Sequence, residues 1–118
     1  MPLLKIQTNV SIAPEAQPPL LAKLSKTVAS QLSKSERYVM VALESAAPML
    51  FAGSDAPLAY VELKSIGLPD AQTPALSAAI CGALNAELDI PAERIYIEFA
   101  APQGRHWGWN GATFCLLG

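Results

Sequence analysis

The chain has 118 residues, enough for one domain with a hydrophobic core of its own. Hydrophobic residues make up 52% of it and charged residues only 15%, against about 25% charged in an average soluble protein, so we expect other subunits to cover part of its surface. The net charge of −2 and the scattered Lys and Arg residues exclude the concentrated basic surface typical of nucleic-acid-binding proteins.

The chain begins with a proline at position two, which bears directly on how its N-terminus is processed. A small penultimate residue favours removal of the initiator methionine, so we expect the mature chain to begin at Pro2. The secondary amine exposed there would titrate near the α-amino value of about 7.7–8.0, and burial would lower its pKa further. From these residues alone two interpretations stay open: Pro2 supplies a base, or it only marks the start of an edge strand over residues 3–8.

The first half of the chain has the pattern strand, helix, strand. Residues 3–8 form the first expected strand, and residues 38–44 (YVMVALE) form the second, which we expect to be covered on both faces because it is nearly all apolar. Between them, helical spacing places five apolar residues on one face of a helix: Leu20, Leu21, Leu24, Val28 and Leu32.

The second half repeats this plan. Strands are expected at 58–66 and 94–99, and the helix between them carries Leu76, Ile80, Leu84 and Leu88 at a spacing of four. Thr73 is expected to be its N-cap and Pro74 its first helical residue. A shift of 57 residues aligns the two halves, by pairing segment 35–37 with 92–94. These features predict a duplicated β-α-β unit.

The expected fold is therefore α/β (α+β), with residues 1–118 as a single domain and an internal pseudo-repeat over about 2–45 and 58–100. Two such units give a four-stranded mixed sheet with two helices on one face. We expect the other face to be apolar and to need a second subunit to cover it. The connection between the halves should hold a short extra strand at 49–52. At the end, a Gly-rich aromatic loop over 102–111 precedes a last strand at 112–117 that could cross to a neighbour.

The two cysteines, Cys81 and Cys115, lie far apart and have no partners at metal-ligand spacing. We expect neither a metal site nor a disulfide framework, and we interpret both as small buried hydrophobic residues. No apolar run approaches the ~20 residues of a membrane helix, and no signal peptide is evident, so the expected compartment is the cytoplasm. Export by a route without a signal peptide stays open.

Five segments together resemble one known family from end to end. They are MPLLKIQTN at the start, KSERYV around Lys34, the tripeptide Ser65-Ile66-Gly67, RIYIEF around Tyr96, and GWNGATF near the end. In this combination the chain resembles the macrophage migration inhibitory factor family of the tautomerase superfamily. The resemblance implies a homotrimer with active sites between subunits, and chemistry that needs no cofactor.

The resemblance also implies roles for particular residues. Pro2 would be the catalytic base that later returns the proton as an acid, and Lys34 would reach a substrate oxygen and depress the pKa of the Pro2 amine. For Lys34 the residues alone offer a second interpretation, a favourable interaction with the C-terminus of the first helix. Ile66 would contribute its backbone N–H. The aromatic residues implied around the substrate are Tyr38, Tyr96 (from an adjacent subunit), Trp109 and Phe114.

The chain departs from the family pattern at several positions. Glu98 stands where animal members commonly have asparagine; its carboxylate could accept a hydrogen bond from a phenol but would repel an anion. Trp107 replaces a small aliphatic residue and would narrow or flatten the mouth of the pocket. Leu58 and Val61 replace a CxxC cysteine pair, so no thiol–disulfide oxidoreductase activity is expected. His106, in the Gly-rich loop, is expected to be solvated.

The favoured function is a cofactor-free keto–enol tautomerase of the phenylpyruvate and dopachrome type, an isomerase acting on small aromatic α-keto acids. Proton transfer between carbon and oxygen needs a base at the carbon and a donor at the oxygen, and needs no metal. The alternative is a secreted, cytokine-like or host-interaction protein with vestigial catalysis. A third hypothesis, hydration or dehalogenation of an unsaturated acid, would rest on Arg105 and Glu98.

Overall fold

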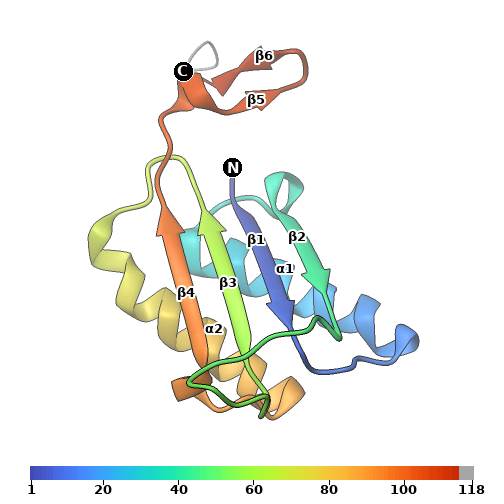
Figure 1. The fold of residues 1–118 in the computed structure, drawn as a ribbon. Coiled ribbons are helices and arrows are strands. Elements are labelled where there is room, and N and C mark those ends of the chain that lie inside the picture. The colour runs from blue at the N-terminus through green and yellow to red at the C-terminus, as the bar shows by residue number, and fades with distance from the viewer. Residues whose placement is uncertain (115–118) are drawn as a thin grey trace.

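The computed structural model describes residues 1–114. Its centre is a four-stranded mixed sheet with the strand order β2-β1-β3-β4 (Figure 1). The two outer pairs are parallel and the central pair, β1 and β3, is antiparallel. The strands are β1 (Leu3–Thr8), β2 (Met40–Glu44), β3 (Ala59–Lys64) and β4 (Ile95–Ala100).

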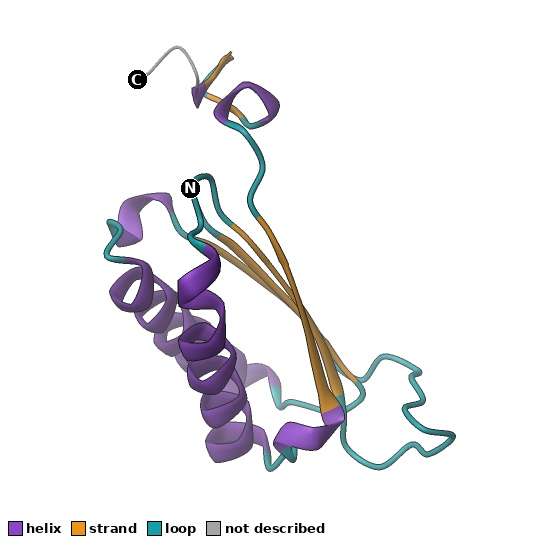
Figure 2. Ribbon diagram, turned by 90° about the vertical axis from the view of Figure 1, so that its left-hand side faces the viewer, coloured by secondary structure: helices purple, strands orange, loops and turns teal. Residues whose placement is uncertain are grey.

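Both long helices, α1 (Gln17–Leu32) and α2 (Thr73–Leu88), lie on the same face of this sheet (Figure 2). The spacing of four seen in the sequence produces the buried stripe of each helix. The buried positions are Leu20, Leu24, Val28 and Leu32 on α1 and Leu76, Ile80 and Leu84 on α2. They pack on alternate residues of the central strands, including Leu4, Ile6, Val61 and Leu63. The predicted fold is confirmed.

The internal repeat has a shift of 56 residues, one fewer than predicted. Leu3 and Ala59 begin equivalent strands, and Gln17 and Thr73 begin equivalent helices. Each long helix also follows a short 3₁₀ turn and ends at a residue with positive φ, Ser33 or Asp89. The pairing of segment 35–37 with 92–94 misled the alignment because it rested on three residues, whereas eight element boundaries fix the spacing.

The N-cap assignment for α2 was also one residue off. Thr73 is the first residue of the helix, and Gln72 is its N-cap. The preceding 3₁₀ turn, Asp70–Gln72, runs directly into the helix, so the Thr73 hydroxyl donates a hydrogen bond to the Asp70 carbonyl at 2.9 Å instead of capping N–H groups.

Strand β2 is shorter and more exposed than predicted. It starts at Met40, because residues Glu36–Tyr38 form a 3₁₀ turn in which the Ser35 hydroxyl accepts a hydrogen bond from the Arg37 N–H at 3.2 Å. It is an edge strand: Val41 packs towards the helices, whereas the other face is exposed within the single chain. The expected burial on both faces is therefore wrong for the isolated chain.

The face of the sheet opposite the helices carries charged and amide side chains together with exposed apolar ones, which corrects the expectation of an apolar face. Its side chains alternate with those of the core along each strand, as the two-residue period requires. They include Lys5, Gln7, Glu44, Glu62, Lys64 and Glu98. The Gln7 amide donates to the Glu44 carboxylate at 2.9 Å across β1 and β2. A uniformly apolar face is thus no argument for subunit association, although Met40 and Tyr96 are exposed on this face.

The connection between the two halves is held by Arg94 and does not form the predicted strand. Residues 49–52 contribute only an isolated bridge between Phe51 and Ser54. The guanidinium of Arg94 donates to the carbonyls of Phe51, Ser54, Ala56 and Pro57 at 2.9–3.1 Å. It also lies 5.3 Å from the centre of the Phe51 ring. One side chain just before β4 therefore fixes a loop that starts some forty residues earlier.

We expect Arg94→Ala to lower the free energy of unfolding by about 2 kcal/mol, because four carbonyl groups lose a charged donor at a partly exposed site. Urea denaturation measures the change. Arg94→Lys is the matched control: it keeps the charge but lacks the planar fork, so it should recover less than half of the loss. An unchanged midpoint in Arg94→Ala would show that the loop is held by other contacts.

A small hairpin follows β4 and extends past the end of the sheet at which β1 begins (Figure 1). It consists of β5 (Gly108–Trp109) and β6 (Ala112–Thr113). Its two turn residues, Asn110 (φ 53°) and Gly111 (φ 77°), both have positive φ, which Asn-Gly pairs favour in two-residue hairpins. The predicted last strand over 112–117 is confirmed only for β6, and residues 115–117 lie outside the described part of the chain.

The cysteines can be compared with their predicted role only in part. Cys81 on α2 is half-buried, and burial raises the pKa of its thiol despite a hydrogen bond to Ser77. It therefore packs as a small apolar residue with a largely protonated thiol at neutral pH. Cys115 lies outside the described residues.

Candidate active site

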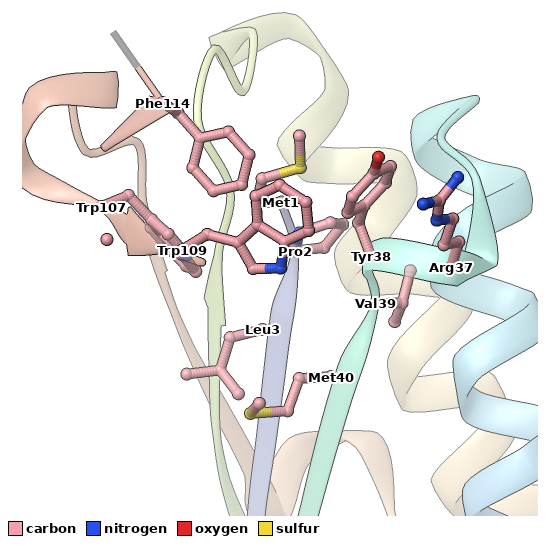
Figure 3. A pocket seen from close by; sticks show the side chains of 11 residues that line it. Met1, Pro2, Leu3, Arg37, Tyr38, Val39, Met40, Trp107, Trp109 and Phe114 are labelled. Carbon is pink, nitrogen blue, oxygen red and sulfur yellow. The ribbon is translucent and has the colours of Figure 1, made fainter. Parts of the chain in front are cut away.

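A cavity of about 280 Å³ lies at the start of β1, under the C-terminal hairpin. Three segments that are far apart in the sequence line it: residues 1–3, residues 37–40, and residues 107–109 together with Phe114 (Figure 3). The topology brings them together. Because β1 and β2 are parallel, both begin at the same end of the sheet, and the hairpin after β4 extends past that end.

Pro2 lies at this end of the sheet, just before β1, and its side chain is fully buried. Its carbonyl accepts a hydrogen bond from the Met40 N–H at 3.0 Å, which ties the start of β1 to the start of β2. Pro2 has no N–H of its own to pair within the sheet. The hydrogen bonds between β1 and its neighbours therefore make no use of the Pro2 ring nitrogen, and Pro2 is one of the residues that line the cavity.

Lys34 and Ile66 meet beside the N-terminal amine. The Lys34 ammonium donates to the Ile66 carbonyl at 3.1 Å. Burial first, and then the charge and hydrogen bonding of Lys34, lower the pKa of the Met1 amine. The register of β1 and β3 explains this meeting: Leu3 lies opposite Lys64, so the residues before Leu3 approach those after Lys64.

The end of α1 determines where Lys34 points. Ser33 has a left-handed conformation (φ 52°) that ends the helix, and the Lys34 N–H caps it by donating to the Ala29 carbonyl at 2.9 Å. The side chain then runs to the end of β3. Its ammonium contacts Ile66, so the interpretation of Lys34 as a charge placed on the helix C-terminus does not describe this arrangement. The turn after Ile66 uses Gly67 at φ 70°.

An aromatic row forms one wall of the cavity. Trp109 lies between Tyr38 and Phe114 (Figure 3). Its ring is edge-on to Tyr38 at 5.6 Å and stacked with Phe114 at 5.8 Å between centroids. The Phe114 N–H donates to the Trp107 carbonyl at 3.2 Å, which holds the ends of the hairpin together. These are aromatic contacts suited to a flat apolar ligand.

Two predicted site residues lie elsewhere in the chain. Tyr96 and Glu98 are on the polar face of β4; Tyr96 is level with Gln7, at the opposite end of β1 from Pro2. Tyr96 is 65% exposed and contacts Phe51 at 4.7 Å between ring centroids. Within one chain, neither residue reaches the cavity.

Glu98 already accepts a phenol hydrogen bond from its own chain. The Tyr60 hydroxyl lies 3.1 Å from the Glu98 carboxylate and 3.2 Å from that of Glu62. Partial desolvation and these two carboxylates raise the pKa of Tyr60 to about 12, so the phenol stays protonated at neutral pH. The departure at Glu98 thus has a local role on the sheet face that sequence comparison alone did not indicate.

Of the nine predicted site residues, five line the cavity: Pro2, Tyr38, Trp107, Trp109 and Phe114. Sequence reasoning missed Leu3, Arg37, Val39 and Met40, which also line it. The predicted strand–helix–strand pattern was a signal for these residues, because two parallel strands joined by a helix begin at the same end of the sheet. The residues just before the second strand were therefore bound to lie near Pro2.

Within residues 1–114, no group of three or more His, Cys, Asp or Glu side chains could hold a metal ion. The same part of the chain contains no helix that is both long and apolar enough to cross a membrane. The expected absence of a metal and of a cofactor stays a prediction.

Comparison with known proteins covers nearly the whole chain. The family model described as macrophage migration inhibitory factor matches residues 1–115. The Meriones unguiculatus macrophage migration inhibitory factor is 37% identical over 97% of this chain and 99% of its own length. The homologue from Trichinella spiralis is 36% identical over 97% of this chain and 100% of its own length.

Solved structures give the same result. The crystal structure of a macrophage migration inhibitory factor homologue from Prochlorococcus marinus superposes with a TM-score of 0.90 at 45% identity, covering 95% of this chain and 98% of that one. The structure from Trichinella spiralis has a TM-score of 0.89 at 34% identity, covering 95% and 99%. Sequence and fold agree, and the chain belongs to the macrophage migration inhibitory factor family, within the tautomerase superfamily.

Proposed function

We propose that this protein is a cofactor-independent keto–enol tautomerase of aromatic α-keto acids such as phenylpyruvate, and that the amine of Pro2, freed by removal of Met1, is its base. The observation that carries the proposal is the position of Pro2: fully buried at the start of β1, on a cavity with an aromatic wall, and next in the chain to an amine that contacts Lys34.

The proposed reaction moves one proton between carbon and oxygen. In the keto-to-enol direction, the neutral Pro2 amine removes a proton from the carbon next to the carbonyl, and the C–H electron pair forms the carbon–carbon double bond of the enolate. The carbonyl oxygen gains the negative charge and is then protonated, with the protonated amine returning the proton. Ketonisation runs through the same steps in reverse. A positioned base contributes roughly 10²–10⁴ in rate.

The surroundings of Pro2 suit a base at neutral pH. Burial and the Lys34 ammonium already lower the pKa of the Met1 amine, and the Pro2 nitrogen lies one residue deeper in the fold. The same two causes would lower the pKa of the Pro2 amine and so favour its neutral form. The Lys34 ammonium can then stabilise the negative charge that develops on the enolate oxygen.

We also propose that the chain works as a homotrimer in which Tyr96 of one subunit approaches the cavity of the next. Support comes from two large apolar side chains left exposed on the outer strands, Tyr96 at 65% and Met40 at 66%, and from the low charge content. Strands β2 and β4 are sheet edges with backbone groups free to pair with another chain. Sedimentation equilibrium tests this: a mass three times that of the chain supports it, and a monomer at micromolar concentration contradicts it.

The test of the activity is the rate at which enol-phenylpyruvate ketonises in the presence of protein whose Met1 is shown by mass spectrometry to be absent. We expect turnover well above the buffer rate. A folded, Met1-free protein that leaves the buffer rate unchanged would contradict the proposal.

A further inference from the structure

The cavity contains one charged side chain among the described residues that line it, that of Arg37. Every other lining side chain is apolar or aromatic. The Lys34 ammonium, the other cation in this region, does not line the cavity and is bonded to the Ile66 carbonyl. Arg37 is therefore the cation that a ligand in this cavity meets directly.

Both the backbone and the side chain of Arg37 are held in place by contacts within the chain. It is the middle residue of the 3₁₀ turn Glu36–Tyr38, whose start is held by the bond from the Arg37 N–H to the Ser35 hydroxyl at 3.2 Å. Its guanidinium carbon lies 5.4 Å from the centre of the Tyr38 ring, within the range of a cation–π contact. Figure 3 shows Arg37 and Tyr38 side by side at the rim of the cavity.

The guanidinium makes no ion pair within the described part of the chain. Its planar donors match a carboxylate, to which Arg can donate two parallel hydrogen bonds. Tyr38, Trp109 and Phe114 continue from it as a row of rings. The cavity thus offers an anion-binding group at one end of an aromatic wall.

We propose that Arg37 binds the carboxylate of the substrate and makes the enzyme prefer aromatic α-keto acids over the corresponding esters. The inference rests on the proposed function and names which group of the substrate is recognised. In this arrangement the carboxylate binds at Arg37, the ring packs against Trp109, and the reacting carbon is presented to Pro2, which lines the same cavity. Lys34 is then left for the enolate oxygen rather than for the carboxylate.

The experiment compares the enol of phenylpyruvate with the enol of its methyl ester, which has the same ring and reacting carbon but no negative charge. Both are assayed with Met1-free wild type, Arg37→Gln, Arg37→Lys and Arg105→Gln. Arg105 is a matched control because it is also a cation near the hairpin but does not line the cavity.

We expect Arg37→Gln to lower kcat/KM for the acid by about tenfold, mainly by raising KM, because a hydrogen-bonded charge pair is lost. The kcat/KM for the ester should change by less than about twofold. Arg37→Lys should have a kcat/KM for the acid between those of wild type and Arg37→Gln, because it keeps the charge but loses the planar pair of N–H donors. Arg105→Gln should leave the ratio of acid to ester unchanged. Added salt should weaken the acid preference of wild type and not that of Arg37→Gln.

The inference would be overturned if Arg37→Gln affected acid and ester equally, or if neither changed while wild type turned over both. An equal effect in Arg105→Gln would show a general influence of surface charge instead. Failure of the proposed function looks different: wild type itself would then accelerate neither substrate. Circular dichroism and sedimentation of each variant separate binding effects from loss of folding.

Discussion

Replacing Pro2 with Gly is expected to reduce kcat for enol-phenylpyruvate by about 10²-fold. Glycine keeps a free α-amine, but that amine is primary, and the backbone that holds it is far less constrained. The buried ring of Pro2 fixes the nitrogen at the cavity. A base that samples many positions spends little time at the reacting carbon, and misplacement of this kind is costly in rate.

The comparison needs proof that the variant still folds, because the Pro2 side chain is fully buried. The thermal midpoint and the sedimentation mass provide it. Leu3→Ala, which changes a neighbouring lining residue and leaves the amine intact, is the control and should lose much less activity. Full activity in folded Pro2→Gly would rule out a role for the proline ring in positioning the base.

Replacing Lys34 with Gln is the second large effect we expect, a loss of about 10² in kcat, because it removes the positive charge beside the N-terminal amine that we propose stabilises the oxyanion. The ammonium also helps to lower the pKa of the N-terminal amine, after burial. Lys34→Arg keeps the positive charge and should retain more activity at every pH. Equal losses in the two variants would show that the contact with Ile66, rather than the charge, is what matters.

The pH profile distinguishes the two effects of Lys34. A base must be neutral to act, so kcat/KM rises with pH through the pKa of the amine. Without the neighbouring cation that pKa is higher, so the rising limb should move to higher pH in Lys34→Gln. The variant should therefore lose more activity at pH 6 than at pH 8, when each is compared with wild type. If kcat/KM rose at the same pH in Lys34→Gln and in wild type, Lys34 would have no influence on the pKa of the amine.

The sequence was enough to predict the fold because the signals were periodic and repeated. Leucines spaced four apart marked both helices, and alternating strands at equivalent positions implied two parallel β-α-β units. The predicted strand boundaries were wrong where local hydrogen bonds determine where a strand begins or whether it forms. Tyr38 looked like strand but belongs to a 3₁₀ turn capped by Ser35, and residues 49–52 looked like strand but are held as a loop by Arg94.

The candidate site was predictable to the extent that it follows from topology and from the family resemblance. Pro2, Tyr38 and the aromatic residues of the hairpin meet as expected. Arg37 was missed because no sequence motif marked it as a site residue, and it is the start of β2 beside β1 that places it at the cavity. Tyr96 was expected to reach the site from an adjacent subunit, and within one chain it lies far from Pro2.

The most direct test of the account is to compare protein with Met1 verified absent with the same protein carrying one additional residue before Pro2. The extension converts the Pro2 amine into an amide, which has no basic lone pair, and it leaves the aromatic wall and Lys34 unchanged. Enol-phenylpyruvate ketonisation is measured for both between pH 5 and pH 9. We expect turnover in the first protein, with kcat/KM rising at a pH below the ordinary α-amino pKa of about 7.7–8.0, and a loss of at least about 10² in the second. Equal rates in the two proteins would contradict the role of Pro2 as the base.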